Sequence, residues 1–220
     1  MIIREYNLGR YVVPKDARNG ICIDIGANVG SFINKYASFF KLIHYYEPLE
    51  QCFRICQNLP YSNLVGFNEA VYHTSDERLP MILHANHDSG SSALSTDAVN
   101  SNWSKNDVIN FVDTVDLARV LERAGGSVDY MKIDCETSEY HFLINKDLTP
   151  IKHIGIELSW QYGQERHSEL VEHILKTHDH VTGNINWYYD KNTEALFTRK
   201  GTAQSFWDIF RFFRNKVEKK

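Results

Sequence analysis

The sequence has few cysteines and none of the spacings that would make them structural. Cys22, Cys52, Cys56 and Cys135 are the only four, and they form no CxxC pair, which argues against zinc-ribbon and redox motifs. Two of them stand in apolar runs, and the other two are four residues apart on an expected helix. We therefore expect four reduced packing residues in a cytoplasmic protein.

Long apolar runs and an excess of positive charge are also absent. No apolar stretch reaches the roughly 18 residues of a membrane span, and Arg4 and Glu5 stand too early for a secretory leader. The net charge of −4 argues against a chain built to coat nucleic acid. The signature Asn/Asp-Pro-Pro-aromatic of nucleic-acid amino-methylation is missing as well. With 220 residues, the chain fits one domain.

Apolar runs alternate with segments of helical spacing, which is typical of α/β proteins. We expect strands at 20–26, 42–47, 64–72, 79–84, 109–112, 128–134 and 152–158, and a closing hairpin of 180–189 and 194–199. Helices are expected at 29–40, 49–58, 115–124 and 166–177. This order predicts a doubly wound, Rossmann-like sheet of seven mostly parallel strands with an antiparallel C-terminal hairpin.

Two segments interrupt the alternation. Residues 73–108 are rich in Ser, Asn and Asp and too long for a simple connection, so we expect an insertion with a hairpin and a long binding loop. Residues 203–220 place aromatic side chains roughly on one side and predict an amphipathic helix. That helix would dock on the domain or, alternatively, face a membrane surface or a partner. Residues 1–202 are expected to form the main domain.

The most informative segment is Asp24-Ile25-Gly26-Ala27-Asn28-Val29-Gly30, at the end of the first strand. In open α/β sheets, ligands bind outside the carboxyl ends of the strands, where the strand order reverses. Gly26 and Gly30 allow a tight turn and a close approach of backbone to a ligand. Asp24 offers acceptors to a cationic or hydroxyl-bearing ligand. Glu47 ends the second strand 21 residues after Gly26 and suits the two hydroxyls of a ribose.

Two kinds of nucleotide cofactor compete for this segment. The dinucleotide motif GxGxxG has a glycine where Asn28 stands. The carboxylate of Asp24 would repel a pyrophosphate, whereas it would tolerate the sulfonium and amino group of S-adenosylmethionine. We therefore favour S-adenosylmethionine over NAD. A nicotinamide-dependent oxidoreductase and a non-catalytic nucleotide-binding domain are the alternatives.

Six blocks of the chain, taken in order, resemble the FkbM-type family of class I S-adenosylmethionine-dependent methyltransferases. They are DIGANVGSF at 24–32, YEPLEQCFRICQN at 46–58, NEAVY at 68–72, VDTVDL at 112–117, DYMKIDCETSE at 129–139 and IEL at 156–158. Described members of that family include O-methyltransferases of sugars and polyketides. The resemblance thus implies methyl transfer to a hydroxyl of a saccharide or other small molecule.

The resemblance also implies roles for individual residues. The methionine and ribose of the cofactor would lie along Asp24, Gly26, Ala27, Asn28 and Gly30, with the ribose hydroxyls held by Glu47. The adenine would meet Glu69 and Ala70, and Ser92 stands in a turn that matches a family feature near the cofactor. One residue departs from the family pattern DxEGxE: Thr137 replaces the glycine.

Three carboxylates suggest how an acceptor hydroxyl loses its proton. Asp134 and Glu136 follow one expected strand, and Glu157 lies near the end of the next. We expect Asp134 to be the acid/base group with Glu136 in support, on one face if the strand continues that far. The three also form a candidate set for a divalent cation, which prefers carboxylate oxygens. The plainer alternative is that Glu136 and Glu139 cap the following helix.

Overall fold

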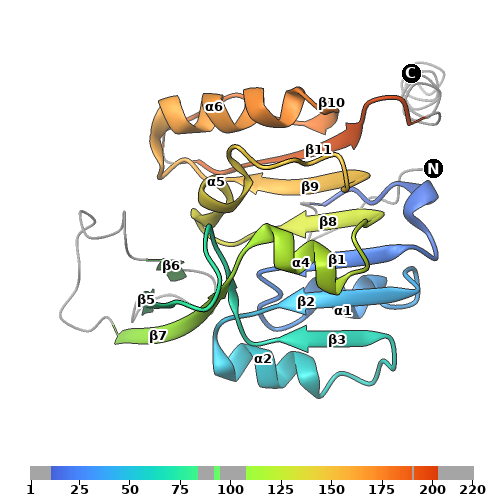
Figure 1. Ribbon diagram of the computed structural model, residues 1–220, viewed down its shortest axis with the longest axis vertical. Coiled ribbons are helices and arrows are strands. Elements are labelled where there is room, and N and C mark those ends of the chain that lie inside the picture. The colour runs from blue at the N-terminus through green and yellow to red at the C-terminus, as the bar shows by residue number, and fades with distance from the viewer. Residues whose placement is uncertain (1–10, 84–91, 95–107, 190, 203–220) are drawn as a thin grey trace, which may run out of the picture.

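The computed structural model describes residues 11–83, 92–94, 108–189 and 191–202. Its main sheet has seven strands in the order β10-β11-β9-β8-β1-β2-β3 (Figure 1). These strands are β1 (Ile21–Ile25), β2 (Leu42–Tyr46), β3 (Leu64–Phe67), β8 (Tyr130–Ile133), β9 (His153–Leu158), β10 (His178–Gly183) and β11 (Thr193–Arg199). Neighbours from β3 to β9 run parallel, and β11 runs antiparallel to both β9 and β10. The predicted fold class is confirmed.

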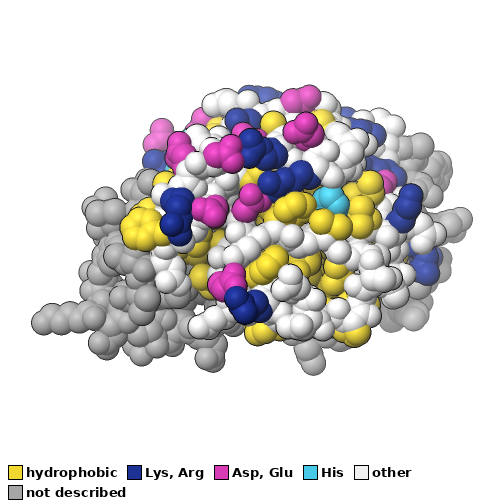
Figure 2. Space-filling model, turned by 60° about the horizontal axis from the view of Figure 1, so that its bottom comes forward, with side chains coloured by type: hydrophobic (Ala, Val, Ile, Leu, Met, Phe, Trp, Pro, Cys, Tyr) yellow, Lys and Arg dark blue, Asp and Glu magenta, His cyan; other side chains and the backbone are white. Residues whose placement is uncertain are grey.

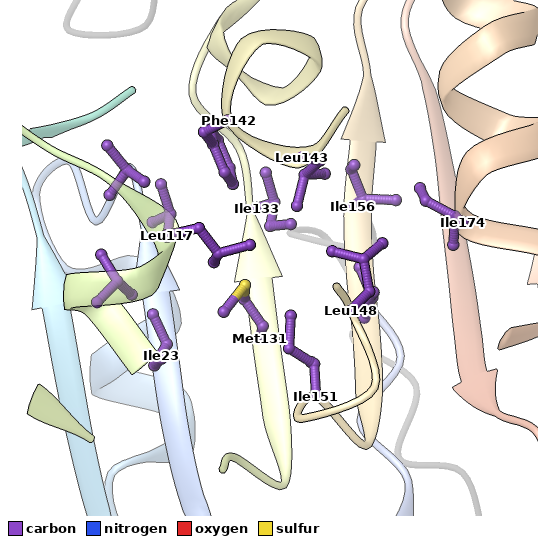
Figure 3. Packing of buried hydrophobic residues seen from close by; sticks show 14 of the residues in the cluster. Ile23, Leu117, Met131, Ile133, Phe142, Leu143, Leu148, Ile151, Ile156 and Ile174 are labelled. Atoms are coloured by element: carbon purple, nitrogen blue, oxygen red, sulfur yellow. The ribbon is translucent and has the colours of Figure 1, made fainter. Parts of the chain in front are cut away.

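Helices and an N-terminal segment cover the two faces of this sheet. On one face, aromatic and apolar side chains of α1 (Ser31–Tyr36) and α2 (Glu50–Gln57) pack together with Tyr11, Val13 and the short helix η1 (Lys15–Ala17). On the other face pack α4 (Leu117–Arg123), α5 (Ser138–Leu143) and α6 (Gly163–Leu175). Figure 3 shows this second core, where Ile133, Ile156 and Phe142 meet over the centre of the sheet.

A second sheet of four strands lies at the carboxyl edge of the first (Figure 1). It has the order β4-β7-β5-β6, with β4 (Ala70–Val71), β5 (Arg78–Leu83), β6 (Ser92–Leu94) and β7 (Val108–Val115). The sequence predicts the strand at 79–84 but not that it belongs to a separate sheet. The prediction of a single strand at 64–72 is wrong, because β3 and β4 are separate strands in different sheets. Asn68 separates β3 from β4, and its amide donates to the carbonyls of Glu47 and Pro48, at 2.8 and 3.0 Å.

Other differences from the prediction have local causes. The strand at 109–112 extends to eight residues because β5 and β4 both pair with it. The helix expected around Glu139 is α5, and the sequence gives no bounds for it because its six residues are too few to show a helical period. The predicted helix 203–220 and most of 73–108 lie outside the described residues.

The surface offers two further observations. On the face that comes forward in Figure 2, basic and acidic side chains stand beside one another with apolar side chains between them. Among the described residues, no helix combines the length and the apolar character that a membrane crossing requires.

Candidate active site

The turn after β1 lies where the strand order of the main sheet reverses. From β1 the chain continues to β2 and β3 on one side, and β8 and β9 lie on the other side of β1. Gly26, Asn28 and Gly30 all have positive φ, at 75°, 50° and 79°. A Cβ on Gly26 would lie 1.8 Å from the carbonyl oxygen of Asp134. Only glycine therefore lets the ends of β1 and β8 approach this closely.

A cleft of about 630 Å³, open space at its mouth included, lies beside this turn. Its lining residues are Ile25, Gly26, Asn28, Tyr46, Glu47, Pro48, Leu49, Glu69, Ala70, Val71, Met81, Asp134, Cys135, Glu136 and Ser138. Seven residues predicted for the cofactor or for catalysis are thus brought together. Met81 and Val71 belong to the second sheet, which supplies an apolar wall.

Glu47 is held rigidly at the end of β2. Its side chain is buried, and its two carboxylate oxygens accept the N–H groups of Asn28 at 2.7 Å and Leu49 at 2.9 Å. Burial raises the pKa of Glu47, and these two donors oppose the rise. Each carboxylate oxygen keeps a further lone pair for a ligand. This geometry suits an acceptor of two neighbouring hydroxyls.

Glu69 does not stand alone at the rim of the cleft. Its carboxylate pairs with both terminal nitrogens of the Arg123 guanidinium, and the Glu69 hydrogen bond raises the pKa of Arg123. The guanidinium also lies over the ring of Phe67, 4.4 Å from its centroid. Arg123 comes from α4, and no motif in the sequence predicts that it belongs to the site.

Asp24 lies beneath the cleft rather than on its wall. It is fully buried, and its carboxylate pairs with Lys132 at 2.9 Å. Lys132 also donates to the carbonyl of Gly26 at 2.6 Å. Burial opposes the charged form of Lys132, but the carboxylates of Asp24 and Asp134 outweigh burial and raise its pKa. The pair thus anchors the glycine turn to β8.

Three carboxylates meet next to the cleft. One oxygen from each of Asp134, Glu136 and Glu157 can be chosen so that all lie within 4.8 Å of one another. Strand β8 does not continue to Glu136, as the expected shared face of Asp134 and Glu136 would require, since it ends at Ile133 and Glu136 has a φ of 50°. The carboxylates are therefore brought together by a turn and not by the alternation of side chains along a strand. Both Asp134 and Glu136 also line the cleft.

Tyr11 reaches the same carboxylates from the other end of the chain. Its side chain is buried. Burial raises the pKa of its hydroxyl, as do the charges of Asp134 and Glu157 and a hydrogen bond to Asp134. No motif at Tyr11 signalled this position.

Ser159 holds both Glu139 and Thr137, the residue that follows Glu136. Glu139 is fully buried and accepts the N–H of Ser159 at 2.9 Å. The hydroxyl of Ser159 accepts the N–H of Thr137 at 3.1 Å. Glu139 therefore ties α5 to the end of β9 rather than facing solvent in the first turn of the helix.

Ala27 and Gly30, which are also predicted to bind the cofactor, are not among the residues that line the cleft. Ala27 is buried, and Gly30 packs on Leu59 and Cys56. The Cys56 thiol donates to the carbonyl of Asn28 at 3.1 Å, and all four cysteines are free, as expected. Ser92 belongs to β6, and Gly90 and Ser91 before it lie outside the described residues.

The chain is similar to known proteins over most of its length. The family model described as "Methyltransferase FkbM domain" matches residues 24–183. No curated protein matches the chain.

Two solved structures have the same fold. One is methyltransferase FkbM from Methylobacillus flagellatus, with 13% identity and a TM-score of 0.50 over 82% of this chain. The other is the fibrillarin pre-rRNA processing protein of Methanococcus jannaschii, with 11% identity and a TM-score of 0.51, covering 88% of this chain and 72% of that one. The chain spans 43% of the length of the Methylobacillus protein. At these identities, the likeness concerns the fold alone.

Proposed function

Because this chain belongs to the FkbM family of S-adenosylmethionine-dependent methyltransferases, we propose that it methylates a hydroxyl of a saccharide or other small-molecule acceptor. The observation that carries the proposal is the meeting of Asp134, Glu136 and Glu157 beside the cleft, with their oxygens within 4.8 Å. An alcohol must lose its proton as it is methylated, and a carboxylate next to the methyl donor serves as the base.

The residues of the cleft fit the methyl donor. Glu47, with one lone pair spare on each oxygen, would hold the ribose hydroxyls. The apolar wall of Ala70, Val71 and Met81 suits the adenine, with Glu69 at its rim. Gly26 and Asn28 leave backbone exposed where the methionine portion would lie.

The chemistry then follows from the side chains. S-adenosylmethionine supplies a methyl group on a sulfonium, so an attacking oxygen gains the methyl group while the carbon–sulfur bond breaks. Asp134 accepts the hydroxyl proton, and Glu136 orients the hydroxyl. The Lys132 ammonium lies 3.9 Å from the Asp134 carboxylate and attracts it. The main work of the protein is to hold donor and acceptor in line.

Calorimetric titration tests the cofactor part of the proposal. S-adenosylmethionine and S-adenosylhomocysteine should bind, and NAD should not. Glu47→Gln should raise the Kd of S-adenosylmethionine at least about tenfold, because a charged hydrogen bond is worth about 1.5–3 kcal/mol. Glu50→Gln is the matched control, since Glu50 is exposed and pairs with Arg54 in the same helix. NAD binding with no binding of S-adenosylmethionine would overturn the assignment.

Transfer of a labelled methyl group to sugar and glycolipid extracts tests the base. Asp134→Asn should lower kcat by about 10²–10⁴-fold while the protein still binds S-adenosylmethionine. Glu172→Gln, an exposed change on α6, should leave kcat unaltered. Full transfer by Asp134→Asn would remove Asp134 as the base.

The same three carboxylates also suit a hard divalent cation. Chelation with EDTA separates the two mechanisms. Loss of transfer that Mg²⁺ restores would assign the carboxylates to a metal, whereas unaltered transfer supports direct proton removal by Asp134.

A further inference from the structure

Three aromatic side chains gather at one end of the β10–β11 hairpin: Trp160, Trp187 and Tyr189, here called the aromatic cluster. The ring of Tyr189 lies 5.3 Å from that of Trp160 and 6.5 Å from that of Trp187, at angles of 59° and 67°. The indole N–H of Trp187 donates to the carbonyl of Trp160 at 3.3 Å. Tyr189 is 72% exposed despite these contacts. The Tyr189 ring is therefore exposed to solvent while its contacts with the two tryptophan rings hold it in place.

The aromatic cluster stands at the same sheet edge as the carboxylates. Trp160 follows the end of β9, three residues after Glu157, and its N–H donates to the Asn192 side chain at 3.2 Å. Between them, Ser159 accepts the N–H of Thr137, the residue after Glu136. Figure 1 shows the end of β9 and the start of β11 side by side at this edge.

A row of acidic residues lies along this edge of the sheet, at the ends of β8 and β9 and the start of β11. Glu194 on β11 is paired in register with Glu157 on β9, so both side chains lie on the same face of the sheet. Carboxylates thus continue from Asp134 and Glu136 through Glu157 to Glu194. Glu157 is buried, whereas Asp134, Glu136 and Glu194 are partly exposed and can accept hydrogen bonds from hydroxyls.

Exposed ring faces next to hydrogen-bond acceptors match one class of ligand. A sugar ring has an apolar face of C–H groups, which carry partial positive charge and suit the negative face of an aromatic ring. Its hydroxyls project around the rim, where carboxylates bind them. A flat phenolic acceptor would stack on the rings but would leave the row of carboxylates unused.

We propose that the aromatic cluster is the acceptor subsite of this methyltransferase and that it holds a sugar ring of the methyl acceptor next to Asp134 and Glu136. The inference rests on the proposed O-methyl transfer and adds to it the surface that selects the acceptor. The cluster acts by binding and takes no part in the chemical step.

The first experiment measures binding without catalysis. Saturation-transfer NMR of the protein with S-adenosylhomocysteine bound is recorded against a panel of monosaccharides and methyl glycosides, with simple phenols as a second arm. We expect saccharide signals that Tyr189→Ala abolishes and Tyr189→Phe keeps, because phenylalanine preserves the ring. Tyr188→Ala is the matched control, since Tyr188 is the neighbouring residue and is 45% exposed. Binding of phenols alone, or of no saccharide, would overturn the proposal.

The second experiment uses labelled methyl transfer to a saccharide that binds. Tyr189→Ala and Trp187→Ala should raise the KM for the saccharide about tenfold, with kcat within about twofold. The calorimetric Kd for S-adenosylmethionine should stay that of the unaltered protein, which also shows that the variants fold. An unaltered KM in both variants defeats the subsite alone. A protein that does not bind S-adenosylmethionine at all defeats the proposed function instead.

Discussion

Thr137 holds a backbone conformation that β-branched residues rarely adopt. Its φ and ψ are 83° and −12°, in the left-handed region, directly before α5. The family pattern that the sequence resembles has a glycine here, and the backbone at Thr137 has a conformation that glycine adopts without strain. The turn keeps this shape because Ser159 holds the Thr137 N–H. The departure noted in the sequence therefore carries a cost in conformational energy.

Thr137→Gly should raise the free energy of unfolding by about 1 kcal/mol, because glycine adopts this conformation without steric strain. Urea denaturation of the two proteins measures the difference. Asn145→Gly is a matched control at a φ of 59°, and it should gain less, since asparagine tolerates the left-handed region. A loss of stability in Thr137→Gly would show that the threonine side chain contributes more than its backbone costs.

Gly26→Ala should destabilise the protein and abolish cofactor binding. Position 26 has a positive φ, and the Cβ of an alanine there would lie 1.8 Å from the carbonyl oxygen of Asp134. Strands β1 and β8 would therefore have to separate. We expect a loss of about 2–4 kcal/mol from strain and overpacking together. Gly125→Ala has a φ of 88° and nothing within 4 Å of its Cβ, so it should cost only about 1–2 kcal/mol. Equal losses in the two variants would refute the role of the close approach.

Among the strand elements, β1 and β8 combine apolar surroundings with a buried ion pair. Parallel central strands usually read as continuous apolar runs, yet Asp24 and Lys132 stand opposite each other in register. Lys132 satisfies its donors with the Asp24 carboxylate and the carbonyls of Ile25 and Gly26. The pair therefore links the register of two strands to the shape of the glycine turn.

Lys132→Met should cost about 3–5 kcal/mol of folding free energy, since it leaves Asp24 charged, buried and without its partner. The double variant Asp24→Leu/Lys132→Met should recover much of that loss. Denaturant unfolding of both variants, with Asp24→Leu to complete the cycle, gives the coupling energy. If the double variant is as unstable as Lys132→Met, the pair does not account for the loss.

Elements of strong local pattern were the ones that could be predicted. Strand β9 is buried along its whole length, and His153 and Glu157 are its only polar side chains, so its apolar run is easy to recognise in the sequence. Helix α5 and strand β4 are too short to show a period. Strand β4 exists because it pairs with β7, more than 40 residues later in the chain. Pairings of this kind leave no local signal in the sequence.

The stability of the whole molecule should depend on pH through buried histidines. His178 is fully buried at the start of β10, with Nε2 2.9 Å from the carbonyl of Ile151 and Nδ1 2.8 Å from the Thr177 hydroxyl. Burial lowers the pKa of His178 to about 4, and the Ile151 carbonyl opposes this only in part. The folded protein thus holds this imidazole neutral.

Because the folded pKa of His178 lies below the unfolded value of about 6.5, its contribution is fully present above about pH 6.5. It is lost as the pH falls towards 4, by up to about 3 kcal/mol. Chemical denaturation between pH 7 and 4 measures this slope.

His178→Gln should flatten the slope, and His73→Gln, an exposed change, should not. Part of the slope should remain in the first variant, because burial also lowers the pKa of His44, His167 and His180. An unaltered slope in His178→Gln would rule out its contribution.

The sequence by itself predicts the alternation of strands and helices, the glycine turn and the position of Glu47, because these features depend on residues that lie close together along the chain. Only the tertiary structure places Tyr11, Arg123 and the aromatic cluster. Tyr11 meets the end of β8 across 122 positions, and Arg123 meets Glu69 across 54. Such contacts arise only when both faces of the sheet are covered and the strand ends converge, since a side chain's neighbours across a sheet are set by packing and not by its own segment.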